Sequence, residues 1–418
     1  MDFKGFNFSD EIIEGLEAMR FEKATPVQEK TIPIIMEGND LIACAQTGTG
    51  KTAAYLLPLC DKLLKKSHQG VKAVILVPTR ELAMQIDQQM EGFGYFLPVS
   101  STAIYGGNDS GEWDRQKKAL ITGADIVVAT PGRMIQHLTM GYVKFDTVEH
   151  LILDEADRML DMGFLEDITQ VVSHMPKERQ TLLFSATMPP KIRDLAKQIL
   201  QNPKEINIAI SKPAEGILQA AYMVYDRQKI PLINSLLKGK ELSSIIIFSS
   251  TKQKVKEINR ALRDKGFNSQ AIHSDLDQKE RNEVLRSFKN RNVQILVATD
   301  IIARGIDIEK IDLVINFDVP RDAEDYVHRV GRTARAASQG VALTFINEDD
   351  QLDFYKIERL IETDIYKIAV PAEMGEAPEY KAKALYEAKG RRKNKKGGKS
   401  FGKKKYGKRD SSSNKSRS

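Results

Sequence analysis

Short apolar runs recur along the chain, and each ends at a polar or turn-forming residue. The first half contains AVILVPT from residue 73, ADIVVATP from 124, HLILDEAD from 150 and TLLFSAT from 181. The second half repeats the scheme with SSIIIFSST from 243, VQILVATD from 293, DLVINFDVP from 312 and GVALTFINEDD from 340. Stretches of helical length separate these runs. Continuous apolar runs indicate strands buried on both faces, so the pattern predicts parallel sheets with crossover helices.

The repetition predicts two α/β domains in tandem. Residues 201–216, QNPKEINIAISKPAEG, contain Pro and Gly without a helical period, so we place a linker at 209–217. The N-terminal domain then spans residues 1–208 and the C-terminal domain 218–370, followed by a tail over 371–418. Ligands of open parallel sheets bind at the carboxyl ends of the strands. The polar clusters that end the apolar runs therefore mark the expected site.

Composition limits the class of protein. With 418 residues, of which 41% are hydrophobic, the chain can form two or three cores. No run approaches the roughly 18 apolar residues of a membrane span, and the start MDFKGFNFSDEII has acids where a secretory signal would be basic and apolar. Cys44 and Cys60 are too few for a disulfide framework or a four-cysteine zinc site. We therefore expect a cytoplasmic multidomain protein without a membrane segment.

The net charge of +6 conceals an asymmetry between body and tail. Residues 389–418 contain 14 Lys or Arg and one acid, Asp410, so this segment carries +13 and the rest of the chain −7. Its Gly, Ser and Lys content cannot form a packed core, which predicts disorder. Such a tail can serve solubility alone, but this charge density interleaved with Phe401 and Tyr406 favours nucleic-acid contact.

A glycine-rich loop follows the apolar segment DLIACA and precedes a helical pattern. Backbone N–H groups of such a loop bind phosphate oxygens, while Lys51 reaches the terminal phosphates and Thr52 ligates Mg²⁺. The generic pattern has Gly where this chain has Ala45. The residues expected around the phosphates are Ala45, Gln46, Thr47, Gly48, Thr49, Gly50, Lys51 and Thr52.

Three acids, Asp154, Glu155 and Asp157, directly follow the apolar run at 151–153. Acids at this position often only cap the next helix, where they accept free N–H groups and favour the positive dipole end. In a chain with a phosphate loop, however, an acid at a later strand end is the usual partner of Mg²⁺ in a nucleoside triphosphatase. We therefore expect Asp154 to bind the metal and Glu155 to polarise the attacking water.

The letters DEAD at residues 154–157, together with the phosphate loop and the motifs below, resemble the DEAD-box RNA helicases over roughly residues 3–370. The resemblance implies two RecA-like domains, hydrolysis of ATP with Mg²⁺, and RNA binding across a shared cleft. The short body with a basic tail looks most like the bacterial RhlE-type group. That likeness implies a role in ribosome assembly or RNA turnover.

The segment FEKATPVQ at 21–28 resembles the adenine-reading segment of that family. The resemblance assigns the adenine edge to Gln28, whose amide suits an adjacent donor and acceptor. It implies that Phe21 stacks on the ring, that Phe3 supports the segment and that Thr25 belongs to the same nucleotide site. Arg20 and Ala24 stand where the family usually has Gly and Pro.

Motifs of the second half complete the resemblance. In DYVHRVGRTARA at 325–336, it implies that Arg329 and Arg332 reach the γ-phosphate as arginine fingers. Ala334 replaces the family's Gly there. In TDIIARGIDI at 299–308, Asp307 is assigned to the ribose. The residues implied to couple the two domains are Asp157, Ser185, Thr187 and His328.

The resemblance also implies a track for the sugar–phosphate backbone of RNA, with little dependence on base sequence. Gly and Thr let the backbone approach phosphates, and Arg adds charge. The matching residues of the first half are Pro78, Thr79, Arg80, Gly106, Gly107, Thr130, Pro131, Gly132 and Arg133. Those of the second half are Ser250, Thr251, Gln278, Arg281, Thr299, Arg304 and Gly305.

Three functions remain to be distinguished. The first is an ATP-dependent RNA helicase that unwinds RNA locally. The second is an RNA clamp or scaffold without significant unwinding, which would be suggested if Lys51, Glu155 or Arg332 were missing, whereas all three are present. The third is a DNA helicase on the same architecture, which the adenine-reading segment and the DEAD spelling disfavour.

Overall fold

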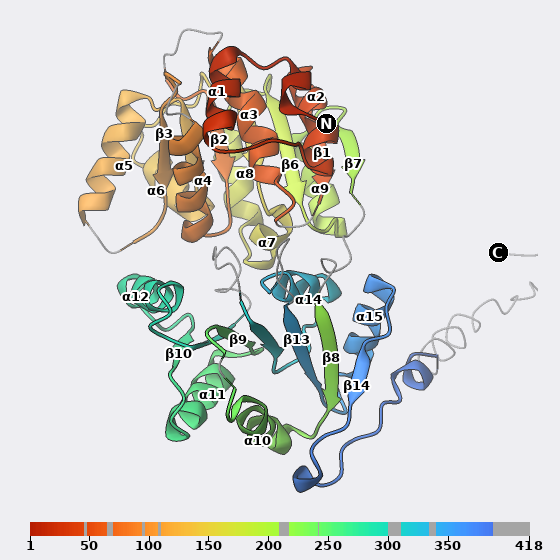
Figure 1. Ribbon diagram of the computed structural model, residues 1–418. Coiled ribbons are helices and arrows are strands. Elements are labelled where there is room, and N and C mark those ends of the chain that lie inside the picture. The colour runs from red at the N-terminus through yellow and green to blue at the C-terminus, as the bar shows by residue number, and fades with distance from the viewer. Residues whose placement is uncertain are drawn as a thin grey trace, which may run out of the picture.

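The structure, a computed structural model, describes residues 1–45, 48–64, 70–93, 97–107, 110–208, 217–240, 242–299, 311–333 and 340–387. These residues form two α/β units, which lie one above the other in Figure 1. Residues 209–216 of the expected linker and the tail from residue 388 onward lie outside the described residues.

The N-terminal unit contains a parallel sheet with the strand order β3-β4-β2-β5-β6-β1-β7. Its strands are β1 (Leu41–Cys44), β2 (Ala73–Leu76), β3 (Ser101–Ile104), β4 (Ile126–Ala129), β5 (His150–Leu153), β6 (Gln180–Ser185) and β7 (Lys204–Asn207). Its helices are η1 (Phe3–Phe6), α1 (Asp10–Ala18), α2 (Pro26–Met36), α3 (Lys51–Leu64), α4 (Arg80–Phe93), α5 (Ser110–Thr122), α6 (Pro131–Thr139), α7 (Ala156–Asp161), α8 (Leu165–Ser173) and α9 (Pro190–Ile199).

The C-terminal unit repeats this topology in its own parallel sheet, whose strand order is β10-β11-β9-β12-β13-β8-β14. Its strands are β8 (Leu218–Met223), β9 (Ile245–Phe248), β10 (Ser269–Ile272), β11 (Ile295–Ala298), β12 (Leu313–Asn316), β13 (Val341–Ile346) and β14 (Tyr366–Ile368). Its helices are α10 (Asp226–Leu237), α11 (Lys252–Asp264), α12 (Gln278–Lys289), α14 (Ala323–Val330), α15 (Gln351–Ile361) and η3 (Ala372–Met374). The prediction of two similar parallel α/β units is confirmed.

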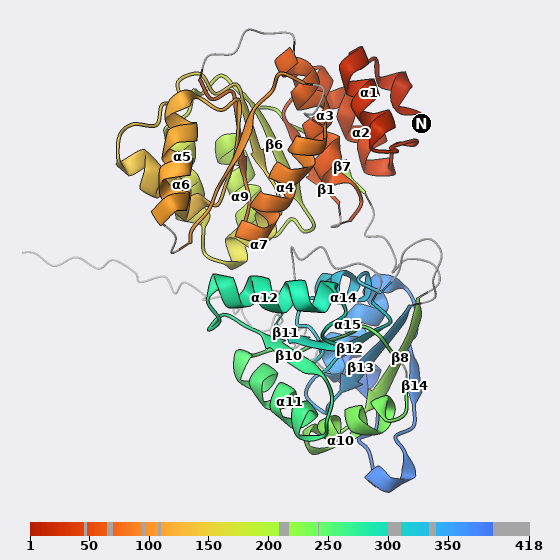
Figure 2. The same cartoon turned by 60° about the vertical axis from the view of Figure 1, so that its left-hand side comes forward.

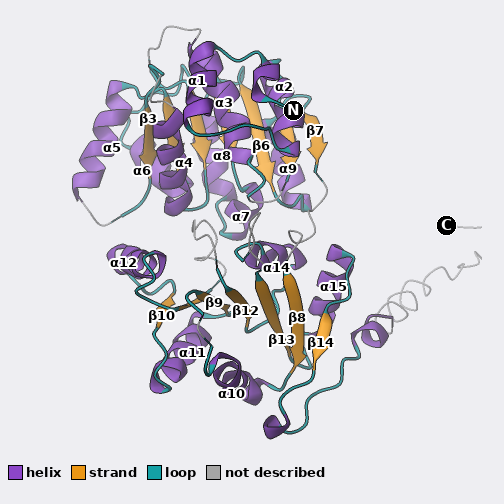
Figure 3. Ribbon diagram, viewed as in Figure 1, coloured by secondary structure: helices purple, strands orange, loops and turns teal. Residues whose placement is uncertain are grey.

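Helices cover both faces of each sheet, as Figure 3 shows by colour. Strand β5 illustrates why the sequence forms a central strand. Leu151 and Leu153 enter the core on one face of the sheet, and Ile152 enters the core on the other. All three side chains are fully buried. Because successive side chains of a strand point to opposite faces, a strand covered on both sides is apolar at nearly every position.

The two units meet where their strands end. In Figure 1, α7 at the edge of the upper unit faces α14 at the edge of the lower unit, and Figure 2 shows α12 and α14 side by side at that edge of the lower unit. Loops that follow the strands of both sheets therefore converge on the space between the units. None of the helices in the described ranges is both long enough and apolar enough to span a bilayer.

Residues 371–387, which the sequence places in the tail, pack against the C-terminal unit. Tyr380 donates a hydrogen bond from its hydroxyl to Glu358 Oε2 at 2.5 Å, and Ala382 is fully buried. The Gln228 side chain donates to the carbonyl oxygens of Met374 and Glu376, each at 2.8 Å. The folded C-terminal unit thus continues past residue 370.

These contacts predict different effects for two truncations. A chain ending at residue 388 should unfold at the same temperature as the full chain. A chain ending at residue 370 should lose at least about 2 kcal/mol of unfolding free energy, since each buried polar group left unpaired costs about 1–3 kcal/mol. Scanning calorimetry of both chains would measure this, and equal transitions would show that residues 371–387 contribute nothing.

Candidate functional site

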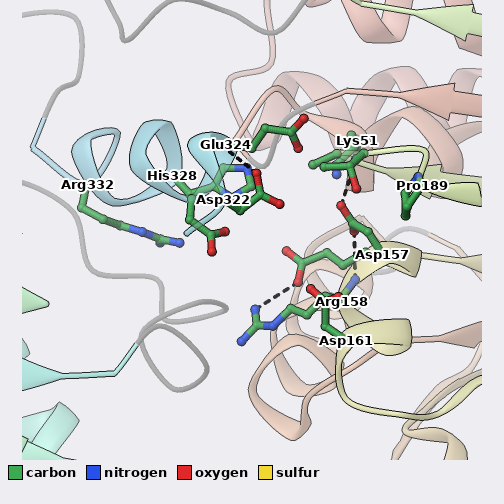
Figure 4. Close-up of a pocket in the computed structure, with 13 residues that line it drawn as sticks. Lys51, Asp157, Arg158, Asp161, Pro189, Asp322, Glu324, His328 and Arg332 are labelled. Carbon is green, nitrogen blue, oxygen red and sulfur yellow. Dashed lines mark hydrogen bonds and ion pairs between the residues drawn. The ribbon is translucent and has the colours of Figure 1, made fainter. Parts of the chain in front are cut away.

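A cavity of about 160 Å³ lies between the two units and is lined by both. In Figure 4, Lys51 and Asp157 approach it from the N-terminal unit, opposite His328 and Arg332 of the C-terminal unit. Its lining includes Lys51, Glu155, Asp157, Arg158, Asp161, Thr187, Asp322, Glu324, Asp325, His328 and Arg332. Charged groups that are far apart in the sequence are therefore brought to one place.

The glycine-rich loop joins β1 to α3, as the sequence predicts. Ala45 at its start is buried and donates its N–H to Ser185 O at 2.9 Å, while Gly48 and Gly50 have φ values of 83° and 90°. A Cβ at Gly50 would lie 2.5 Å from Gln28 Nε2. The left-handed backbone and the close approach of Gln28 both require Gly at this position.

Lys51 is the first residue of α3 and lies in the cavity. Its side chain is buried, and Nζ makes no hydrogen bond to any described residue. A buried ammonium without a hydrogen-bond partner is costly unless a ligand supplies the missing acceptors. The terminal phosphates of a nucleotide, placed at the N-terminus of α3, would supply them.

Asp154 follows β5 and is buried. Oδ2 accepts a hydrogen bond from the Tyr55 hydroxyl at 2.9 Å, and Oδ1 accepts one from the Glu155 N–H at 2.9 Å. Burial raises the pKa of Asp154, and Lys51 opposes that effect. The bonds from Tyr55 and Glu155 fix the orientation of the Asp154 carboxylate next to the phosphate loop.

The residues predicted to hold Mg²⁺ match the coordination that this ion usually has in proteins. Within the described ranges, no group of three or more His, Cys, Asp and Glu side chains has the arrangement of a metal site. Mg²⁺ usually takes one or two carboxylates and completes its ligands with phosphate oxygens and water. Asp154 supplies one buried carboxylate, and Thr52 supplies a hydroxyl near the start of α3; both are hydrogen-bonded to Tyr55. This pair suits an ion that arrives with a nucleotide.

Glu155 adopts the left-handed conformation, with φ 51° and ψ 50°, directly before α7. This rarely populated backbone turns the chain sharply at the end of β5. Its Oε2 pairs with Arg158 Nη1 at 3.1 Å, and both side chains are buried. Burial acts to raise the pKa of Glu155, but Arg158 and then Lys51 outweigh it, so the pKa lies below its usual value. The group predicted to polarise water is thereby kept ionised.

Asp157 and the segment Ser185 to Thr187 are joined, as expected. The Asp157 N–H donates to Ser185 Oγ at 3.1 Å, and the Thr187 N–H donates to Asp157 Oδ2 at 2.9 Å. The connection thus uses the Ser185 hydroxyl and the Thr187 backbone. Asp157, Thr187 and His328 line the same cavity, which brings together the residues expected to couple the two units.

The two arginines predicted to act as fingers lie in different places. Arg332 lines the cavity. Arg329 is buried and donates from Nη1 to Asn316 Oδ1 at 3.1 Å and to Asp318 O at 2.9 Å. Arg329 therefore ties α14 to the end of β12, and the structure does not bring it to the cavity. The catalytic role expected for Arg329 therefore stays a prediction.

The adenine-reading segment packs above the phosphate loop. The Gln28 side chain is buried; its Oε1 accepts from the Thr25 N–H at 2.8 Å and its Nε2 donates to Gly50 O at 3.0 Å. The Phe21 ring lies edge-on to Phe3, with centroids 6.1 Å apart. Phe3 thus supports Phe21 as expected. Each end of the Gln28 amide can make a further hydrogen bond, so it remains able to contact a base.

The residues of the predicted RNA track in the N-terminal unit lie after β2, β3 and β4. Arg80 begins α4, pairs with Glu112 at 3.1 Å and lies 4.4 Å from the Tyr105 ring centroid. A Cβ at Gly107 would lie 2.8 Å from Arg80 Nη1.

Thr130 precedes α6, which begins with Pro131, Gly132 and Arg133. Pro78 and Thr79 precede α4, and Gly106 follows β3. The structure brings these loops to one edge of the sheet.

The described track residues of the C-terminal unit lie after β9, β10 and β11. Ser250 donates its N–H and its hydroxyl to Asp318 Oδ2, both at 2.9 Å. The Thr251 hydroxyl caps α11 by accepting from the Lys254 N–H at 3.2 Å. Gln278 is the first residue of α12, where Arg281 donates to Ser274 O at 3.1 Å, and Thr299 follows β11.

Several predicted site residues lie outside the described residues, and their placement remains a prediction. They are Gln46, Thr47, Arg304, Gly305 and Asp307.

Sequence reasoning missed two residues that hold the acids predicted to be catalytic. Tyr55 lies on the inner face of α3, and only the fold brings it to Asp154. Arg158 had a sequence signal, because it stands three positions after Glu155 at the start of a predicted helix and is the cation nearest to the acid cluster. Acids of the C-terminal unit, Asp322 and Glu324, also line the cavity without a motif that marks them.

Protein-family models match both units. The DEAD/DEAH box helicase model matches residues 25–195, and the helicase conserved C-terminal domain model matches residues 228–337. The chain is 44% identical over 345 residues to the ATP-dependent RNA helicase CshA of Listeria monocytogenes, covering 82% of this chain and 66% of that protein. It is 40% identical over 370 residues to the DEAD-box ATP-dependent RNA helicase CshA of Geobacillus kaustophilus, covering 88% and 78%. Both relatives carry the name CshA, so the RhlE-type grouping is not confirmed.

Solved structures of related proteins have the same fold. A DEAD box protein from Methanococcus jannaschii matches at 39% identity with a TM-score of 0.51, covering 88% of this chain and 99% of that chain. Dbp5 from S. cerevisiae, bound to RNA and ADP BeF3, matches at 27% identity with a TM-score of 0.77, covering 88% and 95%. The expected tandem RecA-like architecture is confirmed.

The pairing of Arg158 with Glu155 predicts a pKa change. Replacing Arg158 with Met removes an opposing cation, so burial should dominate and the pKa of Glu155 should rise. In the native chain that pKa is depressed, so its stabilising contribution is present at neutral pH and is lost as the pH falls through it. Carbon-detected NMR titration of labelled glutamate carboxyls would measure the shift. Arg158→Lys should retain part of the native value, and an unchanged pKa in Arg158→Met would contradict the argument.

Proposed function

Because this chain belongs to the DEAD/DEAH box helicase family, we propose that it is an ATP-dependent RNA helicase. It hydrolyses ATP to ADP and phosphate when RNA is bound, and it unwinds or remodels short RNA duplexes. Its curated relatives are named ATP-dependent RNA helicases. A similar solved structure contains RNA together with ADP BeF3.

The observation that carries this proposal is the cavity shared by the two units. Lys51 of one unit and Arg332 of the other line it together. An ATP molecule whose terminal phosphates contact both cations stabilises the closed arrangement of the units, because it binds that arrangement better than an open one. Hydrolysis removes the phosphate that both units share, so the closed arrangement loses its support.

Each residue at the cavity then has a distinct task. Glu155 polarises the attacking water, and its depressed pKa keeps the carboxylate charged for that purpose. Arg332 neutralises charge that develops on the transferred phosphoryl group. Gln28 and Phe21 select adenine. Mg²⁺, held by Thr52 and Asp154, would neutralise the charge of the phosphates.

RNA binds along the strand ends of both units, through its sugars and phosphates rather than its bases. Closing the units on ATP presses the two halves of this track against one strand. We infer that the strand is bent and no longer fits a duplex, so that unwinding is local. If the protein hydrolyses ATP but separates no duplex, the clamp function is the better description.

The cellular setting is part of the proposal. The basic segment 389–418 and the family favour large structured RNAs, such as ribosomal precursors or RNAs in turnover assemblies, as partners in the cytoplasm. Crosslinking to RNA in cells, followed by sequencing, tests which RNAs are bound.

Glu155→Gln should lower RNA-stimulated ATP hydrolysis at least about 100-fold, because loss of a general base typically costs a factor of 10²–10⁴. ATP and RNA affinity should be retained, since the amide has the shape of the acid. Lys51→Ala is the matched control and should weaken ATP binding itself. Steady-state ATPase assays with and without RNA, beside a duplex-unwinding assay, measure these effects. A full ATPase rate in Glu155→Gln would contradict the assigned role.

A chain ending at residue 388 should bind RNA more weakly at low salt, whatever the RNA sequence, while kcat at saturating RNA stays unchanged. A tail that contacts about five phosphates contributes about −3.5 to the slope of log K against log salt, at about −0.7 per phosphate of a single strand. The truncated chain should therefore show a shallower slope in fluorescence-anisotropy titrations. An identical slope would assign the tail to solubility or to a protein partner.

A further inference from the structure

Trp113, the single tryptophan of the chain, lies on α5 and belongs to none of the core clusters formed by the described residues. Its ring stacks on His137 of α6, with centroids 4.0 Å apart and an interplanar angle of 14°. The guanidinium carbon of Arg133, also on α6, lies 4.4 Å from the Trp113 ring centroid. The indole therefore contacts two residues that lie one helical turn apart.

Gln116 holds the same two residues from the next turn of α5. Its Oε1 accepts hydrogen bonds from Arg133 Nε at 3.0 Å and from His137 Nε2 at 3.1 Å. Its Nε2 donates to Tyr105 O at 3.0 Å, which fixes which end of the amide is oxygen. Both acceptor positions of the oxygen are thus occupied. Gln116 is buried, so neither bond is easily replaced by water.

The protonation of His137 follows from these bonds. Since Nε2 donates to Gln116, Nδ1 is left to accept from the Tyr142 hydroxyl. Burial, with a further contribution from Arg133, lowers the pKa of His137 to about 4. The imidazole is therefore neutral at pH 7, and it packs on Trp113 without repelling the guanidinium of Arg133.

These contacts fix the orientation of the Arg133 guanidinium and leave some of its N–H groups available to a ligand. Its Nε–H is bonded to Gln116 and its Nη1 to Gln136 Oε1 at 3.2 Å, so its remaining N–H groups can donate to a phosphate. A guanidinium held in place loses less conformational freedom when a phosphate binds than a freely rotating one.

We propose that Trp113 and Gln116 are positioning residues that hold Arg133 ready for an RNA phosphate. The inference rests on the proposed function, because it requires that Arg133 contacts RNA. Trp113 and Gln116 act through Arg133 and not through contacts of their own. The same helix carries Glu112, which pairs with Arg80, so α5 supports both arginines of the track in this unit.

The test is a double-mutant cycle on RNA affinity, measured with a single-stranded RNA and a non-hydrolysable ATP analogue. Trp113→Leu should raise the Kd for RNA about 3- to 30-fold, the range expected from loss of a cation–π contact. Trp113→Phe keeps an aromatic face and should recover much of the affinity. In an Arg133→Met background, Trp113→Leu should have no further effect, because the residue that it positions is already gone.

Ile121→Ala is the matched control, since Ile121 lies on the same helix and is 58% exposed. It should bind RNA like the native chain. All variants should bind ATP in the absence of RNA with native affinity. A variant that fails to fold would lose this affinity, so the measurement detects unfolding. If Trp113→Leu fails this criterion, Gln116→Met with Arg133→Met forms a second cycle with the same expected outcome.

Trp113 also supplies its own optical signal. RNA should change its fluorescence in the native chain and leave it nearly unchanged in Arg133→Met. If Trp113→Leu and Arg133→Met have additive effects on RNA affinity while the native chain shows normal RNA-stimulated ATPase activity, the positioning role is wrong. The proposed function would be unaffected by that result. Absence of RNA binding by the native chain would overturn the proposed function and this inference with it.

Discussion

Parallel strands covered on both faces leave few places for polar side chains except the strand ends, and the site depends on this constraint. In the N-terminal unit, β5, β6 and β1 are neighbours in the sheet, with Leu153 beside Leu183 and Cys44 beside Ser185. The acids after β5, the Ser185 segment and the phosphate loop after β1 are therefore side by side. Their proximity follows from strand order, which no local sequence signal contains.

The same constraint explains why residues of both units line one cavity. The N-terminal unit contributes Lys51 and Glu155 to the cavity, and the C-terminal unit contributes His328 and Arg332 from α14 and the turn after it. Arg329, on the same helix, instead faces inward and binds Asn316 and the backbone of Asp318. Neighbouring residues on a helix point in different directions, so one arginine fixes the helix to its own sheet while the other reaches across.

The sequence predicted what periodicity and motifs can encode. Each of the eight apolar runs contains one strand of the structure. These strands are β2, β4, β5 and β6 in the N-terminal sheet and β9, β11, β12 and β13 in the C-terminal sheet. Each run is apolar because its strand is buried on both faces. Strands β3, β7, β8, β10 and β14 were not predicted, and all of these except β8 lie at the edge of a sheet. Strand β7, for example, is mostly exposed and carries no apolar run. Motifs identified Asp154 and Glu155 but not their partners Tyr55 and Arg158, because a motif gives the residue type and the fold gives the neighbour. The extension over 371–387 was missed because it is held by isolated contacts, such as the hydrogen bonds of Gln228 and Tyr380 and the buried Ala382, and carries no continuous apolar run.

Strand order also separates the two expected ligands within each unit. In the N-terminal sheet, the RNA-track residues follow β3, β4 and β2, while the nucleotide residues follow β5, β6 and β1, which form the other half. In the C-terminal sheet, the track residues follow β10, β11 and β9, and the α14 residues follow β12. The boundary between the two sets of residues falls between β2 and β5 in the N-terminal unit and between β9 and β12 in the C-terminal unit. The two strands on either side of each boundary are direct neighbours in the sheet. In Figure 1, α12 lies below the β3 side of the upper unit, whereas α14 lies below α7. Under the proposed function, the two RNA halves therefore face each other, as do the two nucleotide halves, so a ligand that closes one half would also close the other.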